Sequence, residues 1–303
     1  KTLLTMPLSY SYGLSVLNTH LAKGETVRLT SLTPMDRAFW TLLKDEGVTS
    51  LSGVPSFYEM LLRLRFNRQL LPELAYFTQA GGKLKEAGVK TLAEYADKHN
   101  KQCFIMYGQT EATARMSYLP PNMLLKKIDS IGIAIPGGKF EIINQSSSKE
   151  IILENNIAGE LIYKGDNVSL GYAETFEDLN NKDQFKSILN TGDLAFKDKD
   201  NYIYIIGRKN RFAKINGIRV SLIDIENILN ENGFNNAVIS DDKKLLIFIE
   251  ENIGHQNNKT IKEILIKKTT LSPLSFKIKF IKNIPRNDNG KINYFSLKTN
   301  ENY

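Results

Sequence analysis

The alternation of apolar segments with helical patterns between residues 26 and 118 constrains the fold more than any other feature of the chain. Such alternation is typical of a parallel sheet whose faces are covered by helices. The spacing of Phe39, Leu42 and Leu43 predicts one face of a helix that ends near Gly47. In full, we predict helices over 34–47, 56–64 and 83–98, and strands over 48–54, 74–82 and 102–108.

The pattern changes after residue 130, where short β-branched segments are separated by Gly, Asn and Asp. The segments SIGIAIPGG, KFEIIN, GELIYKG and NYIYIIG predict a small antiparallel β-barrel or sandwich. After Gly207, two helical patterns and three apolar strands predict a small α+β unit. We therefore expect a partial α/β layer of a larger N-terminal domain at 1–125, a β-barrel-like subdomain at 126–208 and an α+β C-terminal domain at 209–303.

Composition excludes several classes of protein. The single cysteine, Cys103, rules out an internal disulfide and points to a reducing, cytoplasmic compartment. Since no run of eighteen apolar residues occurs, and the opening letters KTLLTMPLSYSYG lack a signal-peptide pattern, we expect neither a membrane span nor secretion. The net charge of +7 comes from lysines scattered among acids. Without an aromatic-basic stripe, the charge does not predict a nucleic-acid partner.

The motif YGQTE at 107–111 follows a predicted strand directly. Gly108 allows a tight exit from that strand, and Thr110 and Glu111 then stand at the edge where open α/β sheets bind ligands. A purely structural interpretation is also available, because Thr110 suits a helix cap and Glu111 a first helical turn. These five letters alone do not decide between the two.

Three further motifs follow in the sequence. In LNTGD the carboxylate of Asp193 can accept both hydroxyls of a ribose, and Arg208 can reach ribose or phosphate, although each could equally fix a turn or a strand end. In KINGIRVSLIDIE, Gly217 permits a close backbone approach and Arg219 precedes a helix. In PRNDNGK, Lys291 follows letters that are typical of an exposed turn.

Together these motifs resemble those of the adenylate-forming enzymes: acyl-CoA synthetases, aryl-CoA ligases, luciferases and peptide synthetase adenylation domains. The likeness covers essentially the whole chain, since YGQTE, TGD, GRKNRFAKINGIRVSLIDIE and PRNDNGK occur in the family's order and approximate spacing. The resemblance implies two reactions. ATP and Mg²⁺ serve to activate a carboxylic acid as an acyl-adenylate, and the acyl group then passes to the thiol of CoA or of a carrier protein's pantetheine.

The resemblance also implies where the nucleotide lies. Gly81, Gly82 and Lys83 match positions along the adenine. Tyr107 matches the side chain that stacks on the adenine face, and Gly108 follows it in the same nucleotide-binding motif.

The phosphates and the ribose are assigned in the same way. Thr110 is expected to hydrogen-bond the α-phosphate and Glu111 to hold magnesium, which favours one or two carboxylates plus phosphate oxygens. Asp193 is expected to accept the ribose hydroxyls with the help of Arg208, and Arg219 is assigned to the same cofactor site.

The C-terminal domain is expected to move between the two reactions. The lysine that matches Lys291 bridges the carboxylate and the α-phosphate oxygens in the first reaction, and rotation about a hinge then withdraws it. The hinge falls at Asn210, where the family usually has Asp or Lys. Asn tolerates unusual backbone angles, so the hinge can still work. Asn216 and Gly217 match the approach to the pantetheine.

The acid itself is less defined. Tyr10 matches the aromatic residue or histidine beside the acyl carboxylate, although Tyr12 could be a core residue. Ser11 stands where amino-acid-activating members usually have aspartate, which favours a fatty or aryl acid over an α-amino acid.

The family's phosphate loop would precede MPLSYSYG by a few dozen residues, and these letters lack it. We therefore expect the C-terminal part of a longer enzyme, since a chain without that loop would bind ATP poorly. A non-catalytic nucleotide-binding or carrier-docking module is the alternative.

Overall fold

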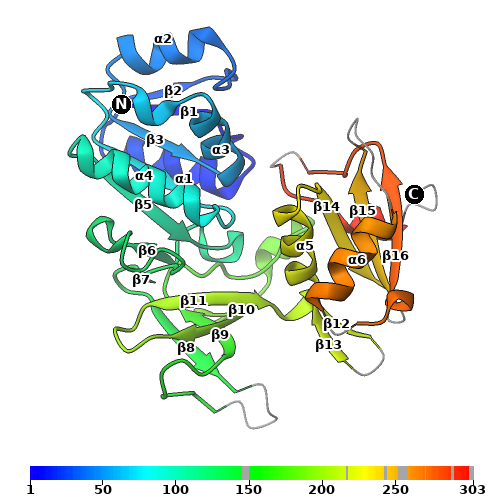
Figure 1. Cartoon of the computed structure of the whole chain (residues 1–303). Helices are drawn as coiled ribbons and strands as arrows, with labels where there is room; N and C mark the ends of the chain where they lie inside the picture. The colour runs from blue at the N-terminus through cyan, green and yellow to red at the C-terminus, as the bar shows by residue number, and fades with distance from the viewer. Residues whose placement is uncertain are drawn as a thin grey trace. The chain divides into compact units, whose positions relative to one another are not determined.

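The computed structural model describes residues 1–144, 150–215, 218–241, 244–251, 258–269, 271–287 and 290–299. The chain forms two compact units, Lys1–Ile206 and Gly207–Tyr303 (Figure 1). The sequence predicts three parts, divided at 125 and 208, where the structure separates two units. The three-part division stays a prediction. Within the described residues, every helix is too short or too polar to cross a membrane.

The first unit is built on a seven-stranded sheet with the order β2-β1-β3-β4-β5-β6-β7. Its strands are β1 (Thr2–Leu4), β2 (Val27–Leu29), β3 (Ser50–Gly53), β4 (Tyr76–Gln79), β5 (Gln102–Tyr107), β6 (Ser117–Leu119) and β7 (Ile133–Ala134). The first five strands pair in parallel, which confirms the predicted parallel arrangement of β3, β4 and β5 and adds β1 and β2 to it. The strands β6 and β7 are antiparallel additions. The carboxyl ends of the parallel strands therefore share one edge.

Helices cover both faces of this sheet. They are α1 (Ser11–Ala22), α2 (Arg37–Asp45), α3 (Pro55–Arg63) and α4 (Glu86–Lys98). The helices α2, α3 and α4 bury Phe39, Tyr58 and Leu92 in one core with the sheet. The helix α1, which we did not predict, packs Tyr12 and Val16 in a different cluster. Successive strand residues point to opposite faces, so Phe77 enters the first core while Thr78 faces the side of α1.

The second sheet of this unit has the order β11-β10-β9-β8. Its strands are β8 (Lys139–Ile143), β9 (Gly159–Lys164), β10 (Ile188–Lys197) and β11 (Ile203–Arg208). The antiparallel pairing is as predicted. The predicted closure into a barrel is not found, because the described strands form an open sheet. At β11, the backbone of Ile203 bonds instead to Ile131 and Gly132 at 2.9 and 3.1 Å.

The second unit combines a short ribbon with a three-stranded sheet. Its elements are β12 (Phe212–Ile215), β13 (Ile218–Ser221), α5 (Leu222–Glu231), β14 (Asn236–Ser240), β15 (Leu245–Glu250), α6 (Asn258–Lys268), β16 (Phe276–Ile281) and α7 (Tyr294–Thr299). The order β14-β15-β16 is antiparallel and then parallel. Leu229 of α5 and Leu265 of α6 pack in one core, and Leu297 of α7 packs in another.

Six short 3₁₀ helices complete the described structure. They are η1 (Phe66–Arg68), η2 (Thr110–Ala112), η3 (Pro121–Met123), η4 (Glu177–Asn180), η5 (Lys209–Arg211) and η6 (Pro273–Ser275). Two of them matter for function, because η2 carries part of the YGQTE motif and η5 contains the expected hinge position, Asn210.

Candidate functional site

The chain turns sharply where β5 ends. A Cβ atom at Gly108 would lie 2.1 Å from the carbonyl oxygen of Ala114, so only glycine permits this approach. The turn is closed by hydrogen bonds from the amide of Ala114 to the carbonyl of Gln109 and from Met116 to Tyr107, at 3.1 and 2.9 Å. This is the tight exit that the sequence predicts, and it leaves Thr110 exposed at the carboxyl edge of the sheet.

The two motifs YGQTE and TGD meet at a buried carboxylate. The hydroxyl of Tyr107 donates to Oδ2 of Asp193 at 2.5 Å, and Nε2 of Gln109 donates to the same oxygen at 3.1 Å. Gln109 also donates to the carbonyl of Thr191 at 2.8 Å. Asp193 is only 2% exposed, and Tyr107 and Gln109 therefore replace the water that it loses. Sequence reasoning found Tyr107 and Asp193 but gave Gln109 no role.

Thr110 and Glu111 are each tied to a distant part of the first unit. The hydroxyls of Thr110 and Ser11 lie 3.1 Å apart, which brings the start of α1 beside the motif. The hydroxyl of Tyr172 donates to Oε1 of Glu111 at 2.7 Å. This bond raises the pKa of Tyr172, since the anionic phenolate would be repelled by the carboxylate. Tyr172 lies sixty-one residues from Glu111, and no local pattern links the two.

The described residues contain no cluster of three or more His, Cys, Asp or Glu side chains that could hold a metal ion. A magnesium ion bound with phosphates needs only one or two protein carboxylates. The carboxylate of Glu111 accepts the Tyr172 bond at Oε1, and a carboxylate has about four acceptor positions in all. Glu111 can therefore provide the one protein carboxylate that such a magnesium site needs.

Tyr10 and the glycine pair lie against each other. Tyr10 immediately precedes α1, and burial raises its pKa. Gly81 has a φ of +86°, and a Cβ there would lie 2.3 Å from the Tyr10 hydroxyl oxygen. The carbonyl of Gly82 accepts a bond from Nε2 of Gln79 at 2.9 Å. Lys83 forms an exposed ion pair with Asp129 at 2.9 Å, a contact of little energetic weight.

Replacing Gly81 with alanine is expected to destabilise the protein by roughly 2–4 kcal/mol, because backbone strain at positive φ adds to overpacking against Tyr10. Urea denaturation measures the change. Gly24→Ala is the matched control, since Gly24 has a φ of +68° but nothing within 4 Å of its Cβ position. That control should cost only about 1–2 kcal/mol. Equal losses in the two variants would show that Tyr10 moves aside without cost.

Lys291 lies in the second unit, where backbone hydrogen bonds hold the chain around it. The amide of Asn287 donates to the carbonyl of Lys291 at 2.8 Å, and the amide of Gly290 donates to the carbonyl of Asn287, also at 2.8 Å. A bridge joins Arg286 to Ile292, and Gly290 has a φ of +78°. The side chain of Lys291 is exposed. The backbone of this lysine is thus held firmly while its ammonium lies at the surface.

Arg211, Glu226 and Tyr294 form a cluster in the same unit, and Tyr294 comes three residues after Lys291 in the sequence. Nη2 of Arg211 lies 2.5 Å from Oε1 of Glu226, and Nη1 donates to the carbonyl of Val238 at 2.8 Å. The Tyr294 hydroxyl donates to Glu226 at 3.1 Å, and the guanidinium lies 3.9 Å from the ring centroid of Tyr294. Burial raises the pKa of Tyr294. Sequence reasoning did not identify this Arg211–Glu226–Tyr294 cluster.

The remaining predicted residues are in the second unit. Arg208 is exposed at the last position of β11. Asn210 lies in η5 and Arg219 in β13. Asn216 and Gly217 lie outside the described residues. The structure thus groups Tyr10, Gly81, Tyr107, Gly108, Thr110, Glu111 and Asp193 in the first unit, and the meeting of this group with Lys291 and Arg208 stays a prediction.

Two curated relatives illustrate the similarity. The chain is 27% identical over 230 residues to the 2-succinylbenzoate–CoA ligase of Oceanobacillus iheyensis, covering 76% of this chain and 45% of the relative. It is 27% identical over 320 residues to the D-alanine–D-alanyl carrier protein ligase of Bacillus licheniformis, covering 95% of this chain and 61% of the relative. The chain thus spans about half the length of these relatives.

Solved structures and a family sequence pattern show the same similarity to acid-activating ligases. The o-succinylbenzoate CoA synthetase of Bacillus subtilis, in complex with its acyl-adenylate intermediate, superposes with a TM-score of 0.78 at 20% identity, covering 99% of this chain and 61% of that one. The same enzyme in complex with ATP and a magnesium ion gives a TM-score of 0.77 at 20% identity, covering 98% and 61%. The sequence pattern of the AMP-binding enzyme family matches residues 1–173, more than half of the chain. The chain therefore belongs to the AMP-binding enzyme family.

Proposed function

We propose that the full-length protein joins a carboxylic acid to AMP and then passes the acyl group to a thiol. The observation that carries this proposal is the Tyr107–Gln109–Asp193 network at the carboxyl edge of the sheet, in a chain of the AMP-binding family. One relative is named for CoA and another for a carrier protein, so either pantetheine thiol suits the second step.

The nucleotide would lie along the edge that this network forms. Gly81, Gly82 and Lys83 would line the adenine, and the ring of Tyr107 would stack on it. The carboxylate of Asp193, which accepts bonds from Tyr107 and Gln109 at Oδ2, would also accept the ribose hydroxyls. Arg208 would add a charged donor to the ribose or phosphates.

Thr110 and Glu111 would act on the phosphates. The exposed Thr110 hydroxyl, held beside Ser11, would donate to an α-phosphate oxygen. Glu111, held in place by Tyr172, would bind Mg²⁺, which neutralises phosphate charge when it is present. A carboxylate oxygen of the acid, positioned by Tyr10, would attack the α-phosphorus. The bond from that phosphorus to the bridging oxygen breaks, and pyrophosphate leaves.

The second unit would supply the mobile groups. Lys291 would place its ammonium beside the attacking carboxylate and the α-phosphate oxygens, where negative charge gathers. Rotation at Asn210 would then withdraw Lys291 and let Asn216 and Gly217 line the path of the pantetheine. The thiolate sulfur attacks the acyl carbon, and AMP leaves. This proposal divides the chain into the three predicted parts, 1–125, 126–208 and 209–303. Arg219 lies in the third part and would belong to the cofactor site.

ATP–pyrophosphate exchange on the full-length protein, with a panel of fatty, aryl and amino acids, tests the proposal. We expect acid-dependent exchange, followed by AMP release and thioester formation when CoA or a pantetheinylated carrier protein is added. An absence of exchange and of AMP release with every acid, despite measurable ATP binding, would instead support a non-catalytic nucleotide-binding module.

A further inference from the structure

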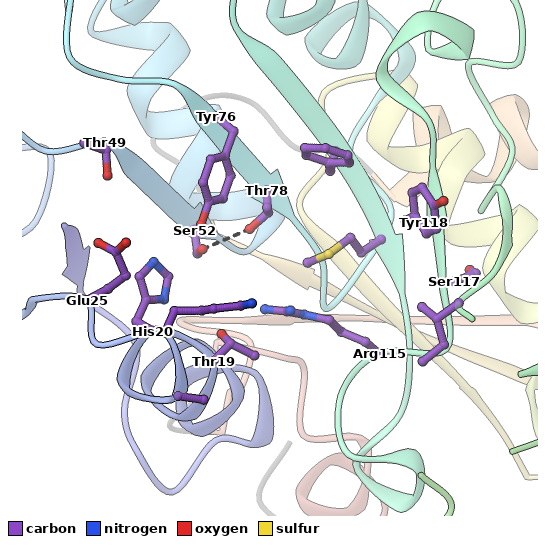
Figure 2. Close-up of a pocket in the computed structure, with 15 residues that line it drawn as sticks. Thr19, His20, Glu25, Thr49, Ser52, Tyr76, Thr78, Arg115, Ser117 and Tyr118 are labelled. Carbon is purple, nitrogen blue, oxygen red and sulfur yellow. Dashed lines mark hydrogen bonds between the residues drawn. The ribbon is translucent and has the colours of Figure 1, made fainter. Parts of the chain in front are cut away.

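A cavity of about 720 Å³ opens between α1 and the sheet of the first unit (Figure 2). It is lined by residues of α1, of the segment after it, and of the strands β3 to β6. Its apolar wall consists of Tyr76, Phe104, Met106, Tyr118 and Ile135. The volume is in the range of small-molecule sites, which are mainly apolar with a few polar groups. None of the residues that line this cavity has a role in the proposed function.

Arg115 is the unusual side chain in this cavity. Its Nε atom is buried and has no hydrogen-bond partner among the described residues. Its backbone carbonyl accepts a bond from Nδ2 of Asn167 at 2.9 Å, which fixes the root of the side chain. Figure 2 shows the side chain reaching across the cavity toward Thr19 and His20 on α1. The residue as a whole is half-buried, so its cost comes from the buried Nε–H group, and an anion bound beside the guanidinium would satisfy that donor.

The other buried polar groups of the cavity are already satisfied. Nδ1 of His20 lies 2.8 Å from the carbonyl of Val16 and donates to it, and Nε2 forms a hydrogen bond with the Ser50 hydroxyl at 2.9 Å. The hydroxyls of Thr78 and Ser52 bond to each other at 2.9 Å. At the exposed rim, Lys23 and Glu25 carry opposite charges. Among the described lining residues, Nε of Arg115 is therefore the buried polar atom whose hydrogen bond is not made.

The cavity lies close to the proposed reaction centre. Met106 lines it, and the next residue, Tyr107, bonds to Asp193. The helix α1 also joins the two places, because Ser11 lies beside Thr110 and Thr19 lines the cavity eight residues later. Eight residues of α-helix span roughly 12 Å. A molecule that reaches from Thr110 into the cavity would thus be of about that length.

We propose that the cavity holds the apolar body of the acid and that the guanidinium of Arg115 binds a second carboxylate within it. The proposal rests on the proposed function and narrows it to a dicarboxylic acid whose acid groups are roughly 12 Å apart. The ammonium of an α-amino acid finds no acidic partner in the buried part of this cavity.

The test is ATP–pyrophosphate exchange by the full-length protein with two acids, decanoate and decanedioate. They differ only in the second carboxylate. We expect the natural chain to prefer decanedioate in kcat/KM by roughly 10- to 100-fold, the usual range for a charged hydrogen bond. Arg115→Gln should abolish this preference by slowing decanedioate, while decanoate changes by less than about threefold. The retained decanoate activity shows that the variant folds.

Lys90→Gln is the control, since it removes a positive charge from an exposed position of α4 that does not line the cavity. We expect the preference for decanedioate to survive it. Equal loss in both variants, or equal use of both acids by the natural chain, overturns the proposal. Calorimetric measurement of decanedioate binding distinguishes a failure of the proposed function from a failure of the proposed Arg115 site. If no acid supports exchange but binding still depends on Arg115, the proposed function fails and the site stands; if decanedioate does not bind, the site fails.

Discussion

Lys291→Ala is expected to lower the rate of acyl-adenylate formation by roughly a thousandfold. An ammonium about 4 Å from the charge that builds on the α-phosphate oxygens contributes roughly 4 kcal/mol at an effective dielectric constant near 20. Each 1.4 kcal/mol or so corresponds to a tenfold change in rate. ATP–pyrophosphate exchange with the preferred acid measures this loss directly.

Lys298→Ala is a suitable control, because Lys298 is an exposed lysine in the last turn of α7, close to Lys291 in the sequence. It should leave exchange within about twofold, as most surface changes do. Thioester formation from a supplied acyl-adenylate should survive in both variants, since the proposed rotation withdraws Lys291 before that step. A loss of less than about tenfold in exchange for Lys291→Ala would refute the assigned role.

Glu226→Ala is expected to lower the free energy of unfolding of the second unit by about 3–5 kcal/mol, the usual cost of removing one partner of a buried ion pair. The guanidinium of Arg211 would lose its carboxylate, and the amide of Val238 and the hydroxyl of Tyr294 would lose their acceptor. Hydrogen exchange of the β14 amides reports on this unit separately from the first. The loss should appear there as faster exchange.

The matched control for this change is Glu231→Ala, at the exposed end of the same helix α5. It should alter stability by no more than about 0.5 kcal/mol. If Glu226→Ala costs less than about 1 kcal/mol, water or a neighbouring side chain must replace the carboxylate, and the cluster would not stabilise the unit as described.

The elements with periodic apolar spacing could be predicted from the sequence. The helices α2, α3 and α4 begin and end within three residues of their predicted bounds. The helix α1 was missed, because SYGLSVLNTHLA is rich in residues of low helix propensity. The predicted barrel or sandwich is found only as an open antiparallel sheet among the described strands, for a different reason. Local pattern predicts strands, but the pairing of Ile203 with Gly132 depends on contacts seventy-one residues apart in the sequence.

The candidate site shows the same limit. Tyr107 and Asp193 could be singled out because each lies in a motif with recognisable chemistry, but their hydrogen bond to each other, eighty-six residues apart, could not be predicted. Gln109 lies inside a motif, but its bond to Asp193 spans eighty-four residues, so the letters gave it no role. Arg115 had no signal at all. Its importance comes from the burial of Nε without a partner among the described residues, which only side-chain packing reveals.

The Arg211–Glu226–Tyr294 cluster has a mechanical consequence for the small unit. Arg211 is the immediate neighbour of Asn210, and Tyr294 comes three residues after Lys291. The cluster ties these two stretches together through one buried carboxylate. In the proposed rotation about Asn210, the segment that carries Lys291 would therefore turn together with the residues beside the pivot. On the proposed function, a change of backbone angle at Asn210 would move Lys291 directly, so torsion at one residue would separate the first reaction from the second.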